Sequence, residues 1–182
     1  MLLACVIFVR IFYPYAVGER KLLMGQDSLE KLQKTFEILV DLELTMGEFY
    51  KICAEKWPED KMFWTVTYKQ ENEHVAFIKK LSGMISNSPE KFILGRSFNP
   101  VAINTIITGI KKNIELVKAN ALSKSKTLHI ARDVEESALE SKIDEIVKTD
   151  DLGFLEITKK IVLQTKTHKE HFDKKIAELK GV

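Results

Sequence analysis

The chain has 182 residues, of which 45% are hydrophobic and 30% are charged, so we expect one domain with a sizeable core under a charged surface. The formal net charge is only +2 and lysines are interspersed among acidic residues, which excludes the basic surface typical of nucleic-acid binding. Eight Gly and four Pro favour long helices over a turn-rich β fold.

Residues 1–24 differ from the domain that we expect over residues 25–182. Their apolar run is interrupted by Arg10 and Pro14, is short for a membrane-spanning helix, and lacks the basic start of a secretory signal. Three interpretations stay open: a membrane anchor, a poor signal sequence, or sequence upstream of a true start at Met24. The polar, helix-starting sequence directly after Met24 favours the third.

The two cysteines, Cys5 and Cys53, do not belong to a C-x-x-C motif. The sequence therefore contains no zinc-ribbon or rubredoxin-type module. Because nothing indicates a disulfide framework, we expect a reducing, cytoplasmic environment.

The first predicted helix begins at Asp27 or Ser28, whose side-chain oxygens can cap it, and ends near the turn sequence KWPED. Its apolar residues have the heptad-like spacing of a bundle helix, at Leu29, Leu32, Phe36, Leu39, Met46, Tyr50 and Cys53. Glu43 falls within this stripe, either at its edge or as an inward carboxylate. Pro58 suits the first turn of a second helix, which we expect over residues 59–85.

The second predicted helix carries an E-x-x-H motif formed by Glu71 and His74. Residues three apart are neighbours on one helical face, and this face should point to the core. A carboxylate and an imidazole on such a face are costly unless they pair with each other or bind a metal ion. Both interpretations stay open for the motif alone.

A long link from Ile85 to Ser123 follows and contains a helix of its own. Asn99 and Pro100 give it a cap and a first helical residue. Its stripe has no acid or histidine and consists of Ile103, Ile106, Ile107, Ile110, Ile114 and Val117. This stripe either covers the bundle or marks an interface for a homodimer.

The third main helix should begin at Ser123 or Ser125 and continue to the turn sequence KTDDLG, with Glu135 in the middle of its apolar face. The fourth helix follows that turn. It carries His168 and His171, which are spaced like the two residues of the E-x-x-H motif.

Residues equidistant from the turn of an antiparallel helical hairpin lie at one height, because both helices rise equally per residue. The midpoint of Glu43 and Glu71 falls in the KWPED turn, and the midpoint of Glu135 and His168 falls in the KTDDLG turn. Each hairpin therefore brings one inward Glu level with a pair of potential ligands. This predicts an antiparallel four-helix bundle with a metal site between its helices.

Bundles that hold two metal ions use one Glu from each of two helices and a Glu-x-x-His pair from each of the other two. The chain fits this pattern except at His168, which we expect where the second Glu belongs. The predicted metal ligands are Glu43, Glu71, His74, Glu135, His168 and His171. A neutral imidazole cannot bridge two ions, so the sequence leaves open whether the site holds two ions, one or none.

The segments LELTMGEFYK, ENEH, ARDVEES and HKEH together resemble the rubrerythrin group of ferritin-like proteins, over roughly residues 27–179. The resemblance implies an all-α, ferritin-like antiparallel four-helix bundle with a long crossover that contains an extra helix. It also implies a di-iron centre, with manganese or zinc as alternatives, and an oxidoreductase acting on peroxide or oxygen. Because no rubredoxin domain follows, the electron donor should be a separate protein. The alternative is a bundle that lost this chemistry and acts as a binding or assembly module.

Overall fold

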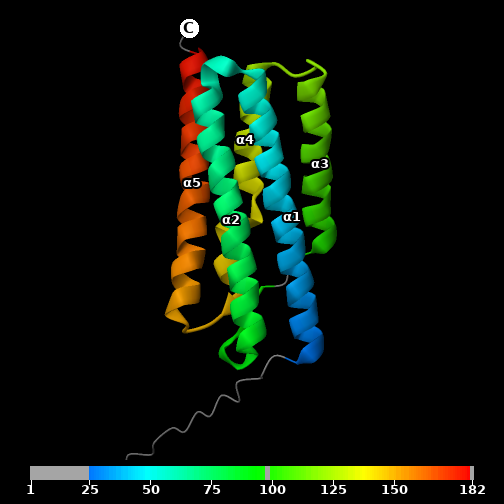
Figure 1. Cartoon of the computed structure of the whole chain (residues 1–182), viewed down its shortest axis with the longest axis vertical. Helices are drawn as coiled ribbons and strands as arrows, with labels where there is room; N and C mark the ends of the chain where they lie inside the picture. The colour runs from blue at the N-terminus through cyan, green and yellow to red at the C-terminus, as the bar shows by residue number, and fades with distance from the viewer. Residues whose placement is uncertain (1–24, 97–98, 181–182) are drawn as a thin grey trace, which may run out of the picture.

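The computed structural model describes residues 25–96 and 99–180, apart from the side chains at 139–141 and 180, and the all-α fold class is confirmed (Figure 1). The apolar N-terminal extension, residues 1–24, lies outside the described residues. The elements are α1 (Gln26–Lys56), η1 (Pro58–Asp60), α2 (Lys61–Asn87), η2 (Pro89–Lys91), β1 (Ile93–Leu94), α3 (Pro100–Lys118), α4 (Lys124–Ser137), η3 (Leu139–Glu145), β2 (Val147–Lys148) and α5 (Leu152–Lys180). In this described part of the chain, none of the helices has the length and apolarity needed to cross a membrane.

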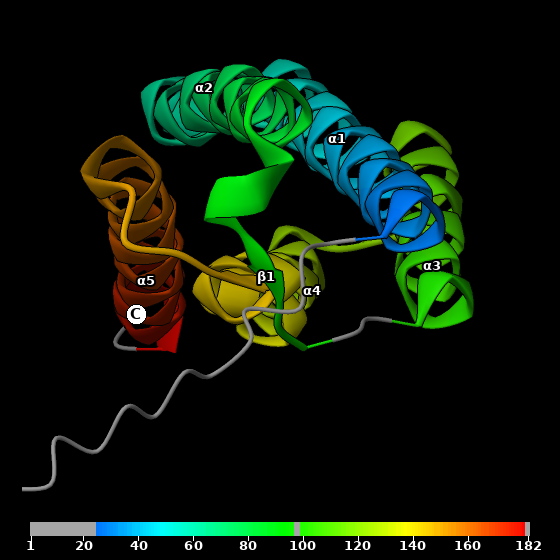
Figure 2. The same ribbon diagram turned by 90° about the horizontal axis from the view of Figure 1, so that it is seen from below.

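Four helices, α1, α2, α4 and α5, run side by side, and α3 lies against α1 (Figures 1 and 2). The main packing partners are α1 with α2 and α3, α4 with α5, and α2 with α5. The chain reverses direction from each helix to the next, so α2 and α4 run in the same direction (Figure 1). Consequently α3 carries the chain back along the length of the molecule before α4 begins.

The predicted N-terminal cap of the first helix is wrong. Gly25, with an extended backbone, occupies the cap position, and no side chain hydrogen-bonds there. Asp27 lies in the first turn instead, where its negative charge favours the positive end of the helix dipole. At the other end the prediction holds, because α1 ends at Lys56 and Pro58 opens the short turn that leads into α2.

The predicted start of α3 is confirmed: the side chain of Asn99 accepts a hydrogen bond from the Val101 backbone N–H at 2.9 Å. The apolar stripe of this helix is buried against the rest of the chain at Ile103, Ile107, Ile110, Ile114 and Val117. It therefore covers α1 and is not the exposed surface on which the expectation of a homodimer rested.

The third main helix begins as predicted but is much shorter than expected. Ser123 caps α4 by accepting a hydrogen bond from the Lys126 N–H, and the helix ends at Ser137. The chain then forms a 3-10 segment and the strand β2, which pairs antiparallel with β1. Gly95 is needed at this pairing, because a Cβ atom there would collide with the backbone carbonyl of Glu145.

An aromatic cluster fills the core beside the KWPED turn. Trp64 is fully buried, and its ring lies 6.0 Å from that of Tyr50 and 5.6 Å from that of Phe172. These three rings come from α2, α1 and α5. Because Tyr50 also reaches Glu135, the cluster is continuous with the polar group described next.

Candidate metal centre

Five acidic and imidazole side chains from four helices meet inside the protein. They are Glu43 of α1, Glu71 and His74 of α2, Glu135 of α4 and His168 of α5, and each is at most 2% exposed. They form two groups of three that share Glu71, and within each group the potential ligand atoms lie within 4.8 Å of one another. The structure thus brings together five of the six predicted ligands.

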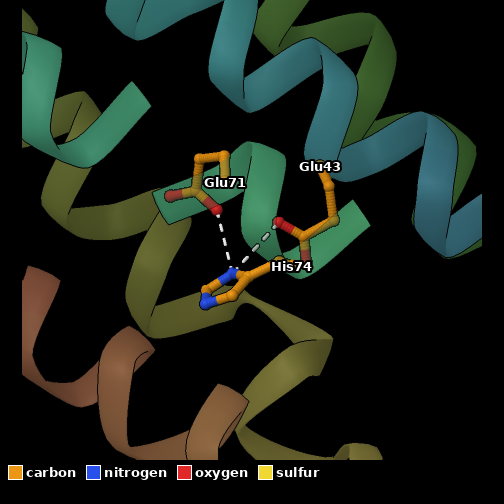
Figure 3. Close-up of side chains that lie close together, drawn as sticks. All are labelled: Glu43, Glu71 and His74. Carbon is orange, nitrogen blue, oxygen red and sulfur yellow. Dashed lines mark ion pairs between the residues drawn. The ribbon is translucent and has the colours of Figure 1, made fainter. Parts of the chain in front are cut away.

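The first group consists of Glu43, Glu71 and His74 (Figure 3). The Nδ1 atom of His74 lies 3.1 Å from Oε2 of Glu71 and 3.4 Å from Oε2 of Glu43. Glu71 and His74 are one helical turn apart on α2, and Glu43 faces them from α1 (Figure 3). The hairpin geometry predicted from the KWPED turn therefore places these carboxylates together.

The second group consists of Glu71, Glu135 and His168. The Nδ1 atom of His168 lies 3.2 Å from Oε1 of Glu71 and 3.3 Å from Oε1 of Glu135. The buried hydroxyl of Tyr50 donates a 2.7 Å hydrogen bond to Oε1 of Glu135. Glu71 therefore turns one oxygen to each histidine and stands between the two groups.

Two glutamines hold the outer edges of the imidazole rings. The Nε2 atom of His74 lies 3.1 Å from Oε1 of Gln164, and that of His168 lies 2.9 Å from Oε1 of Gln70. The amide nitrogen of Gln164 also donates a hydrogen bond to Glu73. This second bond orients the amide so that the Gln164 oxygen faces His74. Each Nε2 thus donates its hydrogen to a glutamine oxygen, and each Nδ1 faces the carboxylates, where it can hold a proton or bind a metal ion. Such outer hydrogen bonds orient histidine ligands in metal sites.

The two halves of the cluster are related residue by residue. Each glutamine stands four residues before its helix's histidine, and each binds the histidine of the other helix. In this register His168 corresponds to His74, and Thr165 corresponds to Glu71. The residue of α5 that corresponds to Glu71 is therefore Thr165 and not His168, which differs from the position expected for His168.

His171, the sixth predicted ligand, is not brought into the cluster. It is exposed and lines a surface pocket with Phe63, Lys174, Lys175 and Glu178. The two histidines of HKEH have the spacing of the E-x-x-H motif, but the pair lies one helical turn further along α5 than the residues that correspond to Glu71 and His74. The repeated Gln-x-x-x-His spacing, at residues 70–74 and 164–168, is the signal in the sequence that would have set the register correctly.

Burial and ion pairing shift the pKa values of Glu71 and His168 in opposite directions. Burial alone would raise the pKa of Glu71, but hydrogen bonds from His168 and His74 outweigh it and hold that pKa far below its usual range. Burial alone would lower the pKa of His168, but hydrogen bonds to Glu135 and Glu71 raise it to about 10. Without a metal ion, a proton on Nδ1 of His168 occupies the direction in which a cation would bind.

The donor set fits divalent metal ions. Three carboxylates and two neutral imidazoles are ligand types that iron, manganese and zinc accept. Two divalent ions together with the three carboxylates would give the site a net charge of +1. The carboxylate between the groups offers one oxygen to each side, as a bridge between two ions requires.

Comparisons of the chain with protein-family models, with curated proteins and with solved structures found no match.

Removing the outer hydrogen bonds should weaken metal binding without removing a ligand. Replacing Gln70 or Gln164 by leucine frees the histidine ring that it holds, and we expect each variant to lose about 10- to 100-fold in metal affinity. Competition with a metal chelator of known affinity measures this loss. Gln33→Leu is the control, because Gln33 bonds Ser86 away from the cluster and its replacement should leave the affinity unchanged.

Proposed function

We propose that this protein is a ferritin-like metalloprotein in which α1, α2, α4 and α5 form a four-helix bundle and α3 belongs to the crossover. The shared direction of α2 and α4 supports this topology, because two hairpins can be joined in that way only by a connection that runs the length of the bundle. The long link with its own helix provides that connection.

The buried cluster is, in this proposal, a centre for two metal ions, with iron as the first candidate. The observation that carries it is the position of Glu71, whose two oxygens face the Nδ1 atoms of two histidines from different helices. Glu43 and His74 would hold one ion, Glu135 and His168 the other, and Glu71 would join them. Tyr50 would keep Glu135 oriented through its hydroxyl.

The proposed activity is oxidoreduction with peroxide or oxygen as the small-molecule substrate and a separate protein as electron donor. Bound iron would supply the redox chemistry. The chain's own residues bind and orient the ions, and the surrounding helices keep bulk water from the carboxylates, which are at most 2% exposed. Low exposure strengthens every charge interaction inside the site.

A second function is favoured by a specific observation, the ion pairs themselves. Both histidines already lie 3.1–3.4 Å from carboxylate oxygens. A bundle with protonated histidines would therefore balance most of the buried charge without metal. Such a protein would be a binding or assembly module.

Metal content and peroxide kinetics separate the two functions. Protein produced with added iron should retain iron after desalting, and the reduced, iron-loaded protein mixed with hydrogen peroxide in a stopped-flow instrument should oxidise faster than free ferrous ion. Iron-free protein, or oxidation no faster than that of free ferrous ion, would favour the non-enzymatic module.

A further inference from the structure

The two halves of the cluster differ at one position, which lies on a surface pocket. On α2 this position is Glu71, and on α5 it is Thr165, which is 3% exposed and uses its hydroxyl proton on the Ile161 carbonyl at 3.1 Å. A threonine side chain is two atoms shorter than that of glutamate. The α5 half of the cluster therefore lacks the carboxylate that Glu71 supplies in the α2 half.

The pocket lies between α4 and α5 and measures about 370 Å³. Its lining includes Glu135 of the cluster together with Thr165, and also Val162, Glu136, Lys166 and Lys169. Because Glu136 and Lys166 are exposed, the pocket opens to solvent. It therefore connects the surface to the short residue beside the second group of ligands.

The charges around this pocket suit an anion once the centre is loaded. Lys169 pairs with Glu136 at 2.9 Å, and Lys166 approaches Glu170 at 4.0 Å, so the pocket mouth is close to neutral. Two divalent ions against three buried carboxylates leave the interior with one net positive charge. A small monoanion at the pocket's inner end would neutralise it at short range.

We propose that Thr165 makes room for an exogenous carboxylate-sized monoanion, which enters through this pocket and acts as the second bridging ligand of the centre. The inference rests on the proposed two-metal site. It assigns a further ligand position to that site and a route by which a small anionic substrate or ligand reaches it.

The test uses the full chain, freed of metal and loaded with Co²⁺, whose visible absorption reports its coordination. Sodium formate, the smallest carboxylate, is titrated into the wild-type protein and into Thr165→Glu. We expect a saturable spectral change in the wild type and none in Thr165→Glu, which supplies its own carboxylate and should still bind two Co²⁺. An unaltered wild-type spectrum with two Co²⁺ bound would overturn the anion site and leave the metal centre standing. A chain that binds no Co²⁺ would overturn both.

A surface variant keeps the test independent of folding at the buried position. Lys166 is 73% exposed, and Lys166→Glu reverses a charge at the pocket mouth without touching the core. Formate should bind this variant more weakly than the wild type, most clearly at low salt, where charge interactions are least screened. Equal formate affinity of the two proteins across low and high salt would overturn the placement of formate at this pocket.

Discussion

Replacing Glu71 by glutamine is expected to abolish tight metal binding in both halves of the cluster. The substitution keeps the shape of the side chain but removes the negative charge that faces both histidines. Because the lost group is a shared ligand, the affinity should fall by more than the roughly 10- to 100-fold typical of an outer hydrogen-bond partner. Metal per chain, measured by elemental analysis after identical loading and desalting, should drop to near zero.

The control for this variant is Glu48→Gln, which removes an exposed carboxylate from α1 outside the cluster. It should retain the wild-type metal content. Circular dichroism checks that both variants stay helical. Equal metal content in Glu71→Gln and the wild type would mean that Glu71 is not a shared ligand.

The second large effect concerns the stability of the metal-free protein and its dependence on pH. The pKa of His168 is about 10 in the folded chain, above the ordinary value of 6.5. A group whose pKa is raised by folding contributes stability that is fully present below its unfolded pKa and is lost as the pH rises through its folded pKa. The contribution of His168 should therefore be complete below about pH 6.5 and disappear towards pH 10. Its size should be on the order of a few kcal/mol.

The comparison that isolates this contribution is between wild type and His168→Gln, both free of metal. Their difference in unfolding free energy, from urea denaturation at a series of pH values, should be largest near pH 6 and shrink steadily towards pH 10. Titratable groups away from the cluster are common to both proteins and cancel. A difference that does not change with pH would show that His168 is not held as a cation by Glu71 and Glu135.

The sequence predicts much of this architecture because helical period and turn position are local properties. Caps at Asn99 and Ser123 are present as expected, and the KWPED turn places Glu43 beside Glu71. Equal rise in two antiparallel helices is enough to bring inward carboxylates to one level. In the α1–α2 hairpin it therefore located the first group of ligands without any knowledge of side-chain contacts.

The sequence did not predict which histidine of α5 points inward or where α4 ends. The first depends on the rotation of the helix about its axis, and the second accompanies backbone pairing between distant segments. One turn separates His168 from His171, and height alone does not decide which of them points inward. The contact of each histidine with the glutamine of the opposite helix decides it. After α4 ends at Ser137, the chain pairs β2 with β1, some fifty residues earlier in the sequence, and the apolar residues Ile143 and Ile146 stay buried outside any α-helix.

The most direct test of the metal centre is anomalous diffraction at the iron edge from crystals of the iron-loaded protein. We expect two iron peaks on either side of the Glu71 carboxylate, one beside Nδ1 of His74 and one beside Nδ1 of His168. Absence of iron from the cluster, with both Nδ1 atoms still in contact with the carboxylates, would contradict the metal centre and identify the cluster as a buried network of ion pairs.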